Sequence, residues 1–222
     1  MKLGIGIPYY KNSPECEVAF KKLMKTLSWQ VTNETLFCIY EDGQVSDWLR
    51  NGYNVGVIEV ISNEKNNGVA YARNIILKNL IDRGSDYILF IDSDDMVDCD
   101  YLRKMYLAGI NKDVDLIESP FIVNGKEYHY TARDNVAGAA IRTELIKDYI
   151  FDEKYIISED TLFIHRLFDE NPNLKRAMIQ SNYYYNYGIN PNSLMMRYER
   201  SEIKLMKEWG NEKSFNKLYS TW

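Results

Sequence analysis

The stretch Tyr87-Ile-Leu-Phe-Ile91 is an unbroken apolar run, and it ends abruptly in Asp92-Ser93-Asp94-Asp95. An apolar run of this length is typical of a strand that is buried on both faces in a parallel sheet. Asp92 and Asp94 therefore follow the carboxyl end of a buried strand and project from the same side of the chain. Mg²⁺ and Mn²⁺ prefer oxygen ligands, commonly one or two carboxylates together with substrate phosphates. The alternative is a polar turn in which Asp98 or Asp100 caps the next helix, but the strand in front favours a metal site.

Apolar runs of the same kind recur in the first half of the chain, at residues 3–9, 36–40 and 55–61. Segments with helical periodicity lie between them, at 15–27 and 69–81. Strands that alternate with helices of this length predict βαβ units. The expected fold is therefore of the α/β class, with an open, mostly parallel central sheet flanked by helices.

The alternation weakens after about residue 124, so we expect a single domain whose second half is less regular. A helix ending near Ile110 and a strand at 116–123 complete the regular part. The elements expected after it are a loop or hairpin at 125–135, a helix at 158–168, a Tyr-rich, half-buried strand or hairpin at 178–187 and an amphipathic helix at 198–219.

Composition excludes several classes of protein. The chain has 222 residues, of which 45% are hydrophobic, so a disordered chain is excluded. No apolar run approaches the roughly 20 residues that a membrane-spanning helix needs. The net charge of -5 gives no support to a nucleic-acid binder. The first residues enter a strand without a signal peptide, and the 3 cysteines are widely spaced. We therefore expect reduced thiols in a cytoplasmic protein.

Other chemistry-bearing residues follow the first strands. Ligands of open α/β sheets bind outside the carboxyl ends of the strands, and Tyr9, Tyr10 and Asp42 come at such ends. Asn67-Gly68 precedes the helix that contains Arg73. Arg73 either reaches back to this edge to bind a phosphate or is a solvated arginine at an ordinary helix start.

A second group of charged residues opens the helix expected at 158–168. Ser158 followed by Glu159 and Asp160 is what helix capping and the helix dipole favour. Alternatively, one of the two acids is a general base. Consecutive helical side chains point about 100° apart, so only one of the acids is expected to face the binding crevice. Arg166 lies about two turns later, as an ion-pair partner for Glu159 or a second phosphate contact.

In this order, these pieces resemble glycosyltransferase family 2, the inverting enzymes with a GT-A (Rossmann-like) fold. The resemblance covers roughly residues 3–195, and Glu41 stands where Asp is more usual. The motifs that carry it are Pro8-Tyr9-Tyr10, Glu41-Asp42-Gly43, Asn67-Gly68 through Ala72-Arg73-Asn74, Asp92-Ser93-Asp94-Asp95, Gly138 to Arg142, Glu159-Asp160 with Arg166-Leu167, and Tyr185 through Asn192-Ser193-Leu194.

The resemblance implies a role for each site residue. Asp160 is the implied catalytic base, and Asp94 with Asp92 is the implied site for Mn²⁺ or Mg²⁺. Asp95, Glu159, Arg166 and Gly138 are implied accessory residues. The implied nucleotide-sugar-binding residues are Pro8, Tyr9, Tyr10, Asp42, Asn67, Arg73, Asp92 and Ser93.

The same resemblance implies a reaction, its partners and a division of the chain. A UDP-linked sugar would be transferred, with inversion, to a hydroxyl of a saccharide or lipid-linked glycan in surface glycan or polysaccharide synthesis. The protein would be cytoplasmic or peripheral at the inner face of the membrane. The chain would form one domain over 1–222, with a nucleotide-sugar-binding half at 1–123, an acceptor and catalytic-base half at 124–198 and a C-terminal helix at 199–222.

Two other functions stay open at this stage. A nucleotidyltransferase that makes sugar nucleotides also uses an α/β sheet with acidic metal ligands. It normally has a Gly-rich loop with Arg or Lys after the first strand, whereas this chain has Pro8-Tyr9-Tyr10-Lys11. The other alternative is a carbohydrate-binding protein with a degenerate site, which the presence of Asp94 and Asp160 disfavours.

Overall fold

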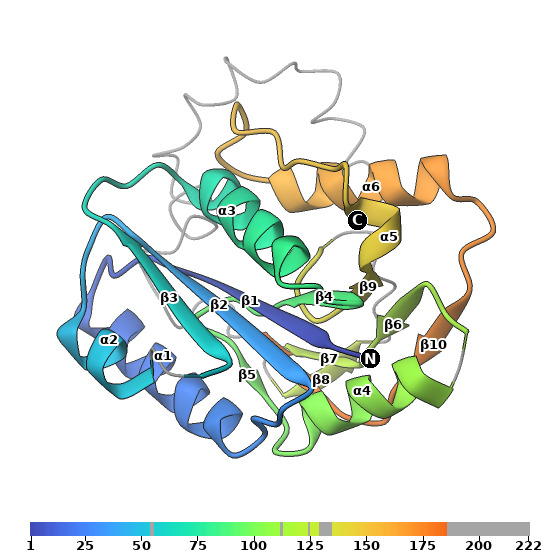
Figure 1. Ribbon diagram of the computed structural model, residues 1–222, viewed down its shortest axis with the longest axis horizontal. Coiled ribbons are helices and arrows are strands. Elements are labelled where there is room, and N and C mark those ends of the chain that lie inside the picture. The colour runs from blue at the N-terminus through green and yellow to red at the C-terminus, as the bar shows by residue number, and fades with distance from the viewer. Residues whose placement is uncertain (54–55, 112, 124, 129–134, 186–222) are drawn as a thin grey trace. The chain divides into compact units, whose positions relative to one another are not determined.

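A computed structural model describes residues 1–53, 56–111, 113–123, 125–128 and 135–185 of the chain (Figure 1). The compact unit that contains them runs from Met1 to Asn186. The helix expected at 198–219 and the C-terminal part of the predicted division lie outside the described residues. None of the helices in the described part is long and apolar enough to cross a membrane.

The central sheet has seven strands in the order β10-β6-β9-β4-β1-β2-β3. Pairing is parallel across β3, β2, β1 and β4, whereas β9 runs antiparallel to both of its neighbours, β4 and β6. This confirms the open, mostly parallel sheet. The strands are β1 (Leu3–Tyr9), β2 (Thr35–Asp42), β3 (Ile58–Asn63), β4 (Tyr87–Phe90), β6 (Leu116–Glu118), β9 (Ala140–Arg142) and β10 (Arg176–Met178).

Helices cover both faces of this sheet. Figure 1 shows α3, α5 and α6 on one face and α1, α2 and α4 on the other. Each set of helices packs on its own apolar core: Phe20 of α1 and Met105 of α4 belong to one core, and Ile76 of α3 and Phe163 of α6 belong to the other. The helices are α1 (Pro14–Ser28), α2 (Asp47–Tyr53), α3 (Val69–Asp82), α4 (Tyr101–Asn111), α5 (Thr143–Ile146) and α6 (Glu159–Glu170).

The strand expected at 116–123 is wrong as a single element, because the chain changes sheets at Ser119-Pro120. Residues before this point form β6, and residues after it form β7 (Phe121–Val123) of a second sheet. Pro120 has no backbone N–H to continue a strand ladder. The second sheet has the order β5-β11-β7-β8, with β5 (Met96–Val97), β8 (Lys126–Tyr128) and β11 (Tyr183–Tyr185).

Several short elements were missed or only partly expected. Strand β8 pairs with β7, so residues 126–128 are the second arm of a hairpin that begins before residue 125. Residues 129–134 of the segment expected to be a loop or hairpin lie outside the described residues. The Tyr-rich segment contains β11, confirmed over Tyr183–Tyr185. Helix α2, helix α5 and strand β9 were not expected, because they are too short to show a clear hydrophobic period.

Glycines in β1 allow α3 to pack close to the sheet. A Cβ atom on Gly6 would lie 2.4 Å from Cγ2 of Ile76 in α3 and 3.0 Å from the ring of Phe90 in β4. A Cβ on Gly4 would lie 2.5 Å from the Ser85 hydroxyl oxygen. The close spacing between α3 and the sheet is therefore possible because these two glycines have no side chains.

Gly6→Ala should consequently destabilise the fold. Overpacking of a closed core costs about 1–3 kcal/mol, and the urea midpoint of unfolding should fall accordingly. Gly52→Ala in α2 is the matched control, because a Cβ there meets nothing within 4 Å. Ala is favoured over Gly inside a helix by up to about 1 kcal/mol, so this variant should be as stable as wild type or slightly more so. Equal midpoints for Gly6→Ala and wild type would contradict the close packing.

Candidate functional site

A buried arginine stands at the centre of the charged residues. Arg73, in the second turn of α3, is only 3% exposed. Its Nη2 lies 2.8 Å from Oδ1 of Asp92, which follows β4. Its Nη1 donates to Oε1 of Glu159 and lies 3.9 Å from Oδ2 of Asp160, both at the start of α6. The interpretation of Arg73 as a solvated arginine is therefore wrong. We call Arg73, Asp92, Glu159 and Asp160 the Arg73 cluster.

The Arg73 cluster brings both acids of α6 to one guanidinium. Both first-turn acids contact Arg73, but the side chain of Glu159 is 4% exposed and that of Asp160 is 18% exposed, so the expectation that only one acid faces the crevice is not contradicted. Ser158 has a φ of 65°, in the left-handed region, and its side chain makes no cap hydrogen bond. Non-glycine residues adopt this conformation at a cost and often near functional sites. Ser158 therefore occupies the predicted N-cap position of α6, with both acids in the first turn, but without a side-chain cap.

Charge is unbalanced in the Arg73 cluster, with three carboxylates around one cation. Burial raises the pKa of Glu159 to about 8, against a partial lowering by Arg73. Burial also raises the pKa of Asp160, again opposed by Arg73. The Asp160 side chain remains 18% exposed, whereas that of Glu159 is 4% exposed. Of the two acids, Asp160 is thus the one that a bound molecule can reach.

Asn74 fixes the segment that leads into α6. Its Oδ1 accepts from the backbone N–H of Phe151 at 2.7 Å, and its Nδ2 donates to the carbonyl of Phe151 at 2.9 Å. The ring of Phe151 stacks on Phe163 of α6, with centroids 4.2 Å apart. Asn74 follows Arg73 directly. One turn of α3 therefore binds both the acids at the start of α6 and the backbone of the segment that leads into it. This role of Asn74 was not predictable from local sequence, because its partner lies 77 residues away.

The carboxylates of the turn after β4 lie in two environments, one partly open to solvent and one inside the protein. The N–H of Asp95 donates to the carbonyl of Asp92 at 3.1 Å, which closes the turn. Asp92, Ser93 and Asp94 are half-buried, whereas Asp95 is 1% exposed and accepts from the hydroxyl of Tyr183 at 2.6 Å. Burial, and then the charge of Asp92, raises the pKa of Asp94 to about 6.

The carboxylates of Asp92 and Asp94 fit a hard divalent cation that takes its other ligands from a substrate. Asp92 and Asp94 offer oxygen atoms only, and like charges this close favour a cation between them. Within the described ranges, no group of three or more metal-ligating side chains comes together. A cation here would therefore need phosphate or water oxygens to complete its coordination. Asp95 lies inside the protein, so of the three acids Asp92 and Asp94 are better placed.

The ends of β1 and β2 lie beside the loop before α3. Tyr10 is 46% exposed, whereas Tyr9 is 1% exposed and packs on Phe20 with ring centroids 4.1 Å apart. Tyr10 is thus the tyrosine of the pair that presents a face to a ligand, and Tyr9 belongs to the core with the neighbouring Pro8 of β1, which is also buried. A Cβ on Gly43 would lie 3.2 Å from the ring of Tyr10, so the ring covers the end of β2.

Asp42 holds the loop that opens α3. Its two carboxylate oxygens accept from the backbone N–H groups of Asn67 and Gly68, each at 2.8 Å. Gly68 has a φ of 95°, which favours glycine. Asp42 is buried, and this burial raises its pKa. Asp42 therefore anchors the α3 start, while the side chain of Asn67 is exposed at the surface.

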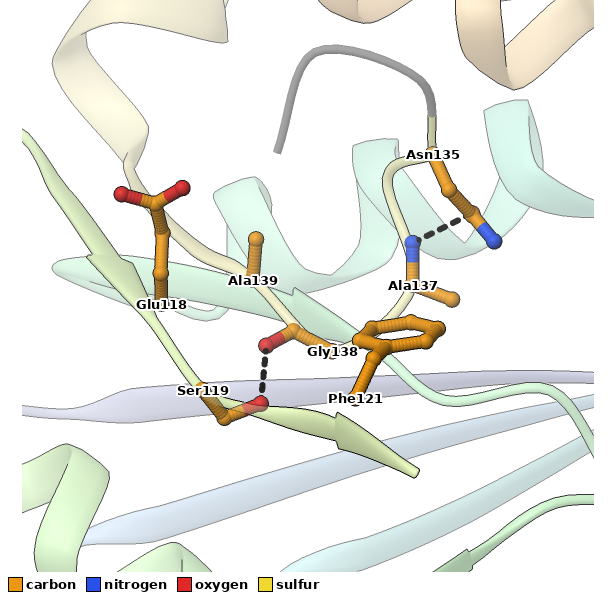
Figure 2. A pocket seen from close by; sticks show the side chains of 7 residues that line it. All are labelled: Glu118, Ser119, Phe121, Asn135, Ala137, Gly138 and Ala139. Atoms are coloured by element: carbon orange, nitrogen blue, oxygen red, sulfur yellow. Dashed lines mark hydrogen bonds between the residues drawn. The ribbon is translucent and has the colours of Figure 1, made fainter. Parts of the chain in front are cut away.

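Two predicted accessory residues lie apart from the Arg73 cluster. Arg166 pairs with Glu170 at 2.8 Å and lies over the ring of Tyr149, so the ion pair expected with Glu159 is wrong. The N–H of Gly138 donates to the carbonyl of Phe90 at 3.0 Å. Figure 2 shows the residues that line a small hollow at Gly138, and no member of the Arg73 cluster is among them. Its lining residues are Glu118, Ser119, Phe121, Asn135, Ala137, Gly138 and Ala139.

The raised pKa of Glu159 predicts a pH-dependent stability. The ordinary pKa of 4.5 applies to the unfolded chain, whereas the folded value is about 8. Between these values the folded protein binds the extra proton, so stability decreases as pH rises. The contribution of one group is at most about 1.4 kcal/mol per pH unit. Glu159→Gln should remove it, as measured by urea unfolding at several pH values between 5 and 8. An unchanged slope in this variant would contradict the assignment.

Comparisons with known proteins identify a family and a fold for this chain. The family model described as glycosyl transferase family 2 matches residues 44–172. No curated protein sequence matches the chain significantly. Among solved structures, TarS 1–349 of S. aureus in complex with UDP-GlcNAc gives a TM-score of 0.69 at 20% identity, covering 86% of this chain and 60% of that chain. The complex of TarS 1–349 with UDP gives a TM-score of 0.67 at 20% identity, covering 86% of this chain and 61% of that chain.

The likeness to TarS shows the fold, which is the GT-A fold expected from the sequence. The full TarS structure gives a TM-score of 0.66 at 20% identity, with 93% of this chain and 39% of that chain covered. The chain thus spans about 60% of the length of TarS 1–349. The family model matches more than half of the residues, and the chain belongs to glycosyltransferase family 2.

Proposed function

We propose that the chain transfers a sugar from a UDP-linked donor to a hydroxyl group of an acceptor, with the help of a divalent cation. The observation that carries this proposal is the ion pairing of Arg73 with Asp92 on one side and with Glu159 and Asp160 on the other. One guanidinium thereby joins Asp92, at the strand end where a nucleotide diphosphate and its metal would bind, to Asp160, a partly exposed carboxylate that suits a base.

The donor end of the site is supported by Tyr10 and by the relatives. Tyr10 presents an exposed ring beside Gly43, where a nucleobase could stack. The TarS structures hold UDP and UDP-GlcNAc, which supports uracil as the base. Asp42 already accepts hydrogen bonds from two backbone N–H groups. Its proposed role in base binding is therefore indirect: it fixes the conformation of the loop that contains Asn67.

Asp94 and Asp92 would hold the cation, Mn²⁺ or Mg²⁺. When bound, such a cation neutralises the charge that develops on the departing diphosphate. Arg73 already forms ion pairs with three carboxylates. Its proposed role is to position Asp92 for binding the cation, and not to contact a phosphate directly.

Asp160 would act as the base. It is the acid of the Arg73 cluster that remains partly exposed, so a hydroxyl group of the acceptor can approach it. A base must be ionised before it accepts a proton. Arg73 favours the ionised form, because its charge lowers a pKa that burial raises. The acceptor oxygen would attack the anomeric carbon as its proton moves to Asp160. The bond from that carbon to the diphosphate oxygen would break, UDP would leave, and this single displacement would invert the carbon.

A saccharide or lipid-linked glycan is the proposed acceptor, in surface glycan or polysaccharide synthesis at the cytoplasmic side. A nucleotidyltransferase is disfavoured by the family match. A carbohydrate-binding protein without activity is the second candidate.

A donor screen tests the proposed function. The protein is incubated with a panel of UDP-sugars and Mn²⁺, and released UDP is measured with and without EDTA. We expect slow, metal-dependent release from one donor, which added glycan acceptors accelerate. A donor that binds only the folded state must also raise the apparent unfolding temperature. Binding without any release would support the carbohydrate-binding alternative, and full activity in EDTA would overturn the metal role.

Asp160→Asn separates catalysis from capping. The amide keeps the size of the side chain but cannot accept a proton, and loss of a general base typically costs about 10²–10⁴-fold in rate. The affinity for the UDP-sugar should stay close to that of wild type. The control is Glu170→Gln on the same helix, whose side chain pairs with Arg166 away from the Arg73 cluster. Equal transfer rates for Asp160→Asn, Glu170→Gln and wild type would leave the base unidentified.

A further inference from the structure

The hydroxyl group of Tyr183 touches both ends of the turn that carries Asp92 and Asp94. It donates to Oδ2 of Asp95 at 2.6 Å and accepts from the backbone N–H of Asp92 at 3.1 Å. Tyr183 is 91 residues from Asp92 in the sequence. A single side chain from a distant strand therefore bridges the two ends of the turn.

The ring of Tyr183 is held from several directions. It is fully buried and stacks on Phe121, with ring centroids 4.7 Å apart and planes 19° apart. Tyr101 lies on another side, with its centroid 6.3 Å away. A Cβ on Gly138 would lie 2.9 Å from the Tyr183 ring. The hydroxyl group thus has a fixed position, since the ring has no space in which to swing.

Backbone pairing adds to the same connection. Strand β5 follows the turn directly, and β11 pairs with it so that Tyr183 lies opposite Val97. The N–H of Asp98 donates to the carbonyl of Asn182 at 3.1 Å. The chain is therefore tied to β11 on the far side of the turn as well.

We infer that Tyr183 is a positioning residue for the metal-binding turn, acting through Asp95. The inference rests on the proposed function of Asp92 and Asp94. Two carboxylates that share a cation repel each other when it is absent, so a turn without an anchor would let them move apart. Tyr183 and Asp95 fix the backbone between them, which keeps both acids ready for a cation.

The alternative is that Tyr183 is a core tyrosine with no influence on binding. Tyr184 provides the matched control, because it is the next residue of β11 and also donates to a carboxylate, Oδ1 of Asp98, at 2.7 Å. Its bond does not involve the Asp92–Asp95 turn. Tyr184→Phe and Tyr183→Phe therefore remove the same chemical group and the same type of hydrogen bond from neighbouring positions.

The test measures how strongly Mn²⁺ tightens the binding of UDP. The dissociation constant of UDP is determined by titration calorimetry in EDTA and in Mn²⁺, and the ratio of the two values is compared among variants. A hydrogen bond to a charged group predicts that Tyr183→Phe lowers this ratio by about tenfold. The constant in EDTA should stay within about twofold of wild type. Tyr184→Phe should leave both quantities unchanged.

A second variant covers the case in which Tyr183→Phe does not fold. Asp95→Ala breaks the same bond from its other end and should give a similar loss of the ratio. The double variant should lose less than the sum of the two single losses, because both single variants remove the Tyr183–Asp95 hydrogen bond, although Tyr183→Phe also removes the acceptor of the Asp92 N–H. A wild-type ratio in Tyr183→Phe or Asp95→Ala would overturn the inference alone. If Mn²⁺ fails to tighten UDP binding in wild type, both the inference and the proposed metal role fail.

Discussion

The burial of the Arg73 guanidinium is the constraint on which the site depends. A cation removed from water costs several kcal/mol, and only partners with good geometry offset this cost. Asp92, Glu159 and Asp160 supply these partners from two elements that are far apart in the sequence. Removing the guanidinium would leave three acids close together without compensation. The positive charge of Arg73 therefore holds the end of β4 and the start of α6 together, and its loss would destabilise both.

The rest of the fold brings Arg73 to that position. Asp42 at the end of β2 binds the N–H groups of Asn67 and Gly68, which fixes where α3 begins. Gly6 in β1 then lets α3 approach the sheet. The edge of the sheet, the loop and the helix thus form a continuous series of contacts that ends at the guanidinium. A shift of α3 along the sheet would move Arg73 away from all three acids.

The elements with a clear pattern were predictable from the sequence, and long-range contacts were not. The apolar run before Asp92 showed a strand end with acids, because buried strands have an unmistakable composition. Tyr9 is the last residue of a strand that is buried on both faces, and Tyr10 lies just beyond it. The sequence did not show where this strand ends, so only the packing of Tyr9 on Phe20 separates the two tyrosines. The change of sheet at Pro120 was hidden in one apolar run. The pairing of Arg73 with Glu159 joins residues 86 apart, which no local pattern reveals.

Charge explains why the proposed reaction calls for a cation. Even with Glu159 protonated, as its raised pKa favours at neutral pH, Asp92 and Asp160 outnumber the one guanidinium, and Asp94 adds a further carboxylate. A nucleoside diphosphate would bring further negative charge to the same place. Like charges in a partly buried site repel strongly, because little water screens them. The Arg73 charge is already committed, so the protein alone offers the diphosphate little attraction at this point. A divalent cation between the turn and the phosphates would reverse the sign of the local potential, and the exact placement of Asp92 and Asp94 by their neighbours then decides how well the donor binds.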